Sequence, residues 1–210
     1  MMAPQFRRPA QLSEDLMETI PGDQDVAYNA ELANLSAWAL LPGPSPFAGS
    51  PQERERIVEL VHTEGVDVIA ESWVRSPEES LAGTLWRGFL FYEWLRRFPE
   101  DAFARFNRAR EVLVARGVNV DEKLADTYSL EDLHTCWGSI FSGEWGEHPV
   151  AKVLLDSAHI LNIIGQVSPE WIGEDDHPLA TAVTRRDEAL LQTSRELLEA
   201  SKRSGRGVLN

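Results

Sequence analysis

The sequence contains very little cysteine and lysine. Among its 210 residues there is one cysteine, Cys136, and there are three lysines. A single cysteine cannot form an internal disulfide, so the chain needs no oxidising compartment to fold. The phosphate-binding patterns Gly-x-x-x-x-Gly-Lys and Gly-x-Gly-x-x-Gly do not occur, which disfavours a nucleotide-binding enzyme.

No apolar stretch is long enough to suggest a membrane span. The most apolar segment, SLAGTLWRGFLFYEWLRRFP at 80–99, is interrupted by Arg87 and Glu93, whereas a spanning helix needs about 20 apolar residues. The N-terminal residues lack the continuous apolar core of a secretory signal. We therefore expect a cytoplasmic protein that does not bind membranes.

Strand signals are also missing. Alternating β-branched runs joined by tight turns do not occur, while apolar residues recur repeatedly at helical spacing. The sequence predicts an all-α, multi-helix bundle of about eight or nine helices around a central apolar helix at about 81–98. The predicted helices lie at about 14–20, 24–41, 51–62, 68–74, 81–98, 100–116, 129–142, 147–164 and 178–204.

We expect one domain over residues 1–210, with 1–41 as a candidate N-terminal helical appendage. The segment 42–51, PGPSPFAGSP, holds four prolines and two glycines and is predicted to be a connector. Residues 117–128 are predicted to be a polar link.

The last predicted helix is long and carries apolar residues at seven-residue spacing. Val183, Leu190 and Leu197 form this stripe, which fits either packing within the bundle or a dimer seam. Both a monomer and a homodimer therefore stay open. We expect removal of residues 178–210 to destabilise the whole domain.

The charge is strongly acidic, with 20 basic and 34 acidic residues and a net charge of −14. This balance opposes direct binding of nucleic acid. Arginine is nevertheless concentrated between Arg87 and Arg116, where Arg105 and Arg108 lie off the apolar stripe of their helix. These two are candidate partner-binding residues, and the alternative is a solvated surface with intramolecular ion pairs.

Catalytic and metal-binding signatures are missing. A Gly-x-Ser-x-Gly elbow does not occur, and the candidate metal-ligand spacing is Asp156-x-x-His159 on one helical face. A surface pair or a satisfied core pair is the favoured explanation of this spacing. Cys136 lies mid-helix, where a thiol usually behaves as a small apolar group. We predict no metal site, no cofactor and no catalytic residue.

Seven tryptophans offer another candidate site. Trp73, Trp86 and Trp94 are predicted either to line a ligand pocket or to fill the core. Arg87 follows Trp86 on the central helix and should be partly withdrawn from water. Our hypothesis pairs it with Glu71 of the preceding helix, because a buried charge needs a partner, and the alternative is a ligand contact.

One stretch resembles a known group of proteins. The residues Ile69-Ala70-Glu71-Ser72-Trp73, Arg75-Ser76, Ser80-Leu81, Gly83 and Leu85-Trp86-Arg87, with a looser match at 140–144, are similar to helical actinobacterial proteins of roughly 200 residues without an established activity. Ala82 stands where that group has proline. Some members carry the label RNA polymerase beta subunit, but a chain of 23.6 kDa cannot contain that large subunit. The resemblance implies a helical fold and no catalytic residues.

Two functions follow as expectations. The first is a non-catalytic cytoplasmic interaction or regulatory protein, whose protein partner is unknown and could belong to the transcription machinery. The second is a helical bundle that binds a small ligand or a metal, and could be an enzyme, using the Trp73, Trp86 and Trp94 cluster or Asp156 and His159.

Overall fold

The computed structural model describes residues 26–41, 50–144, 149–167 and 180–206, and this part of the chain is all-helical, without strands. The predicted fold class is therefore confirmed. The helices are α2 (Val26–Ala39), α3 (Pro51–Glu64), α4 (Asp67–Trp73), α5 (Leu81–Arg97), α6 (Pro99–Ala115), α7 (Val120–Leu124), α8 (Leu130–Phe141), α9 (Val150–Gly165) and α10 (Ala180–Gly205). The helix predicted at 14–20 and most of the connector lie outside the described residues.

Serine caps begin several helices. Ser50 precedes Pro51 and forms a reciprocal capping box with Glu53 at the start of α3. Ser129 forms another with Asp132 at the start of α8. The Ser80 hydroxyl accepts a hydrogen bond from the Gly83 backbone N–H at 3.0 Å and begins α5. Each cap satisfies a backbone donor that the first turn would otherwise leave unpaired.

Helix α5 is the centre of the fold, as predicted. It contacts α2, α4, α6, α8 and α10, and its buried side chains belong to the main hydrophobic core. At Gly88 a Cβ atom would lie 2.1 Å from the Trp137 ring of α8. Glycine at this position is what lets the two helices approach so closely.

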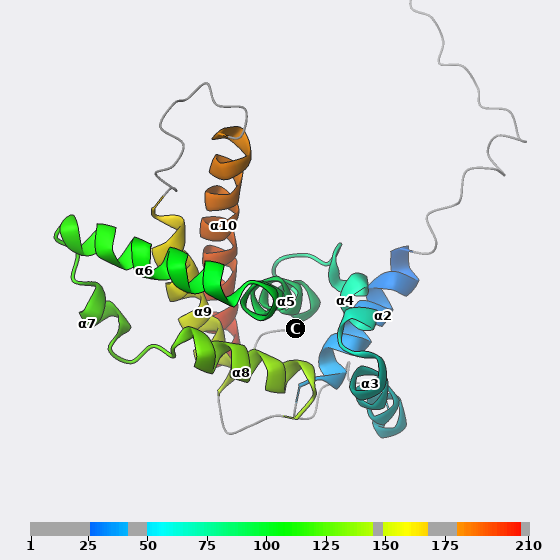
Figure 1. The fold of residues 1–210 in the computed structure, drawn as a ribbon. Helices are drawn as coiled ribbons and strands as arrows, with labels where there is room; N and C mark the ends of the chain where they lie inside the picture. Colours follow the sequence, from blue (N-terminus) through cyan, green and yellow to red (C-terminus); the bar gives the residue numbers. More distant parts are fainter. Residues whose placement is uncertain (1–25, 42–49, 145–148, 168–179, 207–210) are drawn as a thin grey trace, which may run out of the picture.

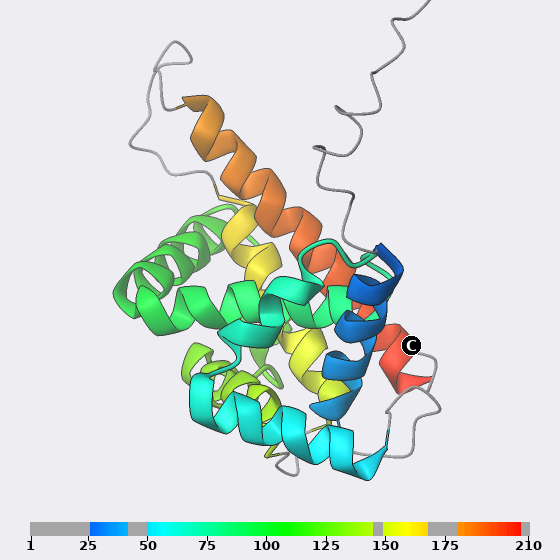
Figure 2. The same ribbon diagram turned by 90° about the vertical axis from the view of Figure 1, so that its right-hand side faces the viewer.

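Helices α9 and α10 run side by side in opposite directions (Figures 1 and 2). Leu197 and Ala200 of α10 are fully buried in the main core. The Ser194 hydroxyl donates to the Ala158 carbonyl of α9 at 2.7 Å, and the Ser201 hydroxyl donates to the Ala151 carbonyl at 2.7 Å. Leu190 and Leu197 of the predicted stripe thus pack within the bundle, while the side chain of Val183 lies outside the described part of the structure.

Several other helices flank α5 on two sides (Figure 1). Helices α2, α3 and α4 lie on one side, and α6 and α7 on the other. Helix α2 contributes Ala33, Ala37 and Leu40 to the same core as α5. No helix within the described ranges has both the length and the apolar character that a membrane crossing requires.

Candidate functional site

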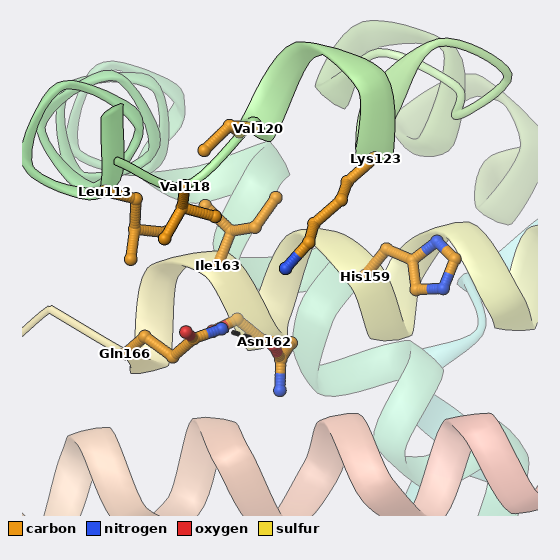
Figure 3. A pocket seen from close by; sticks show the side chains of 8 residues that line it. All are labelled: Leu113, Val118, Val120, Lys123, His159, Asn162, Ile163 and Gln166. Atoms are coloured by element: carbon orange, nitrogen blue, oxygen red, sulfur yellow. Dashed lines mark hydrogen bonds between the residues drawn. The ribbon is translucent and has the colours of Figure 1, made fainter. Parts of the chain in front are cut away.

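The turn between α6 and α7 builds one wall of a cavity. Gly117 ends α6 with φ of 81°, a left-handed conformation that glycine adopts without the clash of a Cβ atom. The Val118 backbone N–H then donates to the Leu113 carbonyl at 3.0 Å. The reversed chain brings Val118 and Val120 back toward α9 (Figure 3).

Two contacts position the start of helix α7. The Asn119 side chain accepts a hydrogen bond from the Glu122 backbone N–H at 3.3 Å and caps the helix. Arg110 of α6 donates to the Asp121 carboxylate at 2.6 Å. The contact between Arg110 and Asp121 joins α7 to α6 and so positions the backbone that carries Lys123.

Helix α9 supplies the opposite wall. His159, Asn162, Ile163 and Gln166 are spaced by three or four residues and therefore share one helical face. The Gln166 amide nitrogen donates to the Asn162 side-chain oxygen and to its backbone carbonyl at 3.2 Å. The two amides are thus held together at one end of this face.

The two walls enclose a cavity of about 440 Å³, within the size range of sites that hold small organic molecules. Apolar and polar side chains both line it: Leu113, Val118, Val120, Lys123, His159, Asn162, Ile163 and Gln166 (Figure 3). The apolar members extend a small second core that also contains Ala109 and Val167. An apolar surface with a few polar groups is the usual composition of a ligand site.

Lys123 carries the one formal charge among the lysine, arginine, aspartate and glutamate side chains that line this cavity. Figure 3 shows its ammonium group turned from α7 toward α9, near Ile163. Within the described part of the chain this ammonium has no hydrogen bond or ion pair, whereas its neighbours Asp121 and Glu122 bond to Arg110 and Asn119. Lys123 is exposed, so solvent or a bound anion can pair with its ammonium group.

The predicted pair between Arg87 and Glu71 is wrong. Glu71 is exposed, and Arg87 instead forms an ion pair with Glu196 of α10 and donates to the Gly83 carbonyl at 2.9 Å. The Arg87 side chain is 18% exposed and that of Glu196 is 11% exposed, so Arg87 is withdrawn from water as expected. The pair links the central helix to the C-terminal helix, which the sequence pattern could not reveal.

A second carboxylate joins this pair. Burial alone would raise the pKa of Glu196, but hydrogen bonds from Arg87 and Gln192 outweigh burial and lower it. A hydrogen bond with Glu196 and the charge of that residue raise the pKa of Glu78. The two carboxyl groups therefore favour sharing one proton.

The three candidate tryptophans all pack in or on the main hydrophobic core, each with its own neighbours. Trp73 is completely buried, stacks on Phe141 and donates its indole N–H to the Ser36 hydroxyl at 2.9 Å. Trp86 stacks on Phe89. Trp94 lies farther along α5 and donates to Asp101 at 3.0 Å. Each contacts core or helix neighbours, and the cavity described above is lined by other residues.

The two candidate arginines of α6 have different surroundings. Arg105 donates to Asp187 of α10 at 3.0 Å and lies 5.6 Å from the centre of the Trp94 ring. Arg108 is exposed and lies 3.9 Å from Glu111 on its own helix. Arg105 thus connects two helices, while Arg108 belongs to the charged surface of α6.

Asp156 and His159 lie in different environments. Asp156 is buried and accepts from the Tyr128 backbone N–H at 3.0 Å and from Lys152 at 2.7 Å, whereas His159 is exposed and lines the cavity. Among the described residues, no group of three or more histidine, cysteine, aspartate or glutamate side chains is placed to hold a metal ion. Asp156 acts as an anchor for the chain entering α8.

Cys136 is buried in α8. Burial and the charges of Asp132 and Asp156 raise the pKa of its thiol. The protonated thiol is a poor nucleophile, so its surroundings suit an apolar packing role.

The cavity includes residues that the sequence analysis did not select. Residues 117–128 were predicted to be a polar link, but they contain α7 and the lining residue Lys123. A signal was present, because Asn119 followed by Glu122 three positions later is a helix-start pattern. The turn back onto α9 depends on tertiary packing and had no comparable signal.

Comparison with known proteins finds no matching family model, no matching curated protein and no matching solved structure. The function of this chain must therefore be inferred from its own residues.

Proposed function

We propose that this chain is a binding protein without catalysis of its own, and that it holds a small molecule in the cavity between α6, α7 and α9. The observation that carries the proposal is a 440 Å³ space with an apolar surface and an unpaired ammonium group. Of the two functions expected from the sequence, small-ligand binding has this structural support. The ligand site differs from both sites suggested there, although His159 belongs to it.

The absence of a catalytic role is part of the proposal. His159 has no hydrogen bond to another described side chain, so no second group orients it as a general base requires. Lys123 is exposed, whereas catalytic lysines usually lie in enclosed sites. The cavity therefore suits binding better than acid–base chemistry.

The test is a small-molecule screen with the full chain, followed by nuclear magnetic resonance mapping of the hits. We expect ligands that stabilise the protein and shift the backbone signals of α7 and of 159–166. Replacing Ile163 with Phe should place a bulky ring on the apolar lining of the cavity and weaken binding. Val68→Phe is the matched control, because Val68 is exposed on α4 and outside the cavity. Ligands whose affinity is unchanged by Ile163→Phe would contradict the proposal.

A regulatory interaction with another protein is the second candidate, supported by a different observation. Most of the large apolar side chains that are exposed come from α2 to α5: Tyr28, Leu32, Leu60, Val68, Val74 and Leu90. Exposed apolar side chains favour a protein partner when they form one patch. A pull-down that loses its partner with Leu60→Glu but keeps it with Glu59→Gln would support this function.

The cellular setting belongs to the same proposal. A cytoplasmic location is supported by the single buried cysteine, which needs no oxidising environment. Kinship with the helical actinobacterial proteins and contact with the transcription machinery stay predictions from the sequence. Fractionation of native cells tests the location, since recovery in a membrane or secreted fraction would contradict it.

A further inference from the structure

The lining of the α6–α7–α9 cavity is divided into apolar and polar parts. Leu113 of α6 and the two valines Val118 and Val120 face Ile163 of α9, and together they form an aliphatic surface (Figure 3). Lys123, His159 and the two amides supply the polar groups. A ligand that satisfies both parts needs a hydrocarbon body and a polar head.

The sign of the head group follows from the charges. Lys123 is a cation, and no aspartate or glutamate lines the cavity. The nearest acids in the sequence on α7 have partners, because Asp121 binds Arg110 and Glu122 binds the Asn119 amide. An anionic head would therefore pair with Lys123 without competition from these carboxylates, whereas a cationic head would meet a like charge.

The number of negative charges on the ligand's head group follows from the number of cationic side chains that line the cavity. No arginine lines the cavity, and arginine supplies the forked donor set that recognises phosphate by two parallel bonds. One ammonium group matches one negative charge. A carboxylate fits this condition better than a phosphate monoester, which carries close to two charges at neutral pH.

The amide pair offers a second polar contact. After Gln166 donates to the Asn162 side-chain oxygen, the Asn162 amide N–H groups and the Gln166 side-chain oxygen have no partner among the described residues. They can donate to and accept from a carboxylate oxygen or a hydroxyl group on the ligand.

We propose that the cavity binds an amphipathic monocarboxylate, with the carboxylate paired to Lys123 and the hydrocarbon body on Leu113, Val118, Val120 and Ile163. This inference rests on the proposed function, since it names the ligand class of the same site.

The experiment titrates the full chain with four probes that share an eight-carbon body: octanoate, octanamide, octylamine and octyl phosphate. Affinities are measured by calorimetry, and the site is mapped by nuclear magnetic resonance. Octanoate should bind about tenfold more tightly than octanamide, as expected for one charged hydrogen bond. Octylamine and octyl phosphate should bind more weakly than octanoate.

Variants of the protein then test whether Lys123 is the residue that pairs with the carboxylate. Lys123→Met should lower octanoate affinity about tenfold and leave octanamide affinity unchanged. Lys123→Arg should retain the preference for octanoate. Lys202→Met is the matched control, because Lys202 is exposed on α10 and pairs with Glu199 at 2.6 Å, and it should change neither affinity.

The outcomes separate the two proposals. Equal binding of octanoate and octanamide, both unaffected by Lys123→Met, would overturn the carboxylate assignment while retaining a small-molecule site. Tighter binding of octyl phosphate would likewise overturn it. If none of the probes shifts signals of α7 or of 159–166, and the screen described above also finds no ligand there, the proposed function itself fails.

Discussion

The two sides of α9 are packed very differently. Toward α10 the side chains are small and the helices are close: Ala158 and Gly165 are buried, and a Cβ atom on Gly165 would lie 2.9 Å from Leu191. Toward α6 and α7, the same helix borders a cavity of about 440 Å³. Protein interiors are normally filled to crystal-like density, so the contrast marks the second side as the place where a ligand can add contacts.

The polar groups differ in the same way. Toward α10, the Ala158 carbonyl receives the Ser194 hydroxyl. Toward α7, the Lys123 ammonium has no partner within the described chain. A filled interface with satisfied groups contributes to stability, and a hollow one with an exposed cation that has no protein partner is suited to binding.

The strongest test of the packed side removes α10. A chain truncated before Ala180 should lose its cooperative unfolding transition, because Leu197 and Ala200 are completely buried in the main core and Glu196 pairs with Arg87. Circular dichroism during thermal and urea unfolding measures this. A truncated chain that still unfolds cooperatively, and differs only in its association by light scattering, would show that α10 is an association seam.

Adding volume should affect the two sides unequally. Gly165→Val should cost roughly 3 kcal/mol in the free energy of unfolding, at the upper end of overpacking effects, because the backbone of α10 also lies within reach at 3.3 Å. Ile163→Phe, on the cavity side, should cost less than about 1.5 kcal/mol. Urea denaturation compares the pair, and equal losses would mean that the cavity side is as tightly constrained as the α10 side.

Two lysines near α9 provide a matched electrostatic test. Lys152→Met should cost about 2 kcal/mol, because it leaves the Asp156 carboxylate, 2% exposed, without its charged donor. Lys123→Met should change the unfolding free energy by less than about 0.5 kcal/mol, because this side chain has no partner to lose. If Lys123→Met destabilised the protein as strongly, its ammonium would have a structural partner and the cavity would lose its unpaired cation.

The smallest expected effect is a pH dependence at Glu78. The pKa of Glu196 is lowered, so its charged form stabilises the fold and this contribution is lost as pH falls below the usual value of 4.5. The pKa of Glu78 is raised, so its protonated form stabilises the fold. This stabilisation is complete at pH values below 4.5, the usual pKa, and is lost as pH rises through the raised pKa. The pair thus contributes most between the two pKa values.

Glu78→Gln should therefore raise the melting temperature slightly at pH 7, where it removes repulsion from Glu196, and the gain should disappear near pH 4.5. Differential scanning calorimetry at several pH values measures the shift. Glu71→Gln is the control, since Glu71 is exposed and should show no such dependence. An equal gain at every pH would exclude the shared proton as the cause.

The sequence by itself determined the helices and the central position of α5. Helical spacing, serine caps and a nearly uncharged apolar stretch act locally, and local signals can be recognised in a linear sequence. They predicted α5 over 81–98, and the structure has Leu81–Arg97. They also predicted that Arg87 would be partly buried.

Only the tertiary structure decided which groups surround Arg87 and Lys123. The partner of Arg87 is Glu196, 109 residues away, because α5 and α10 pack together. The order of the helices along the sequence gives no indication of this contact. The cavity likewise requires the Gly117 turn to bring α7 onto α9. Periodicity specifies which face of a helix is apolar, but the packing of whole helices determines which faces meet and where space remains between them.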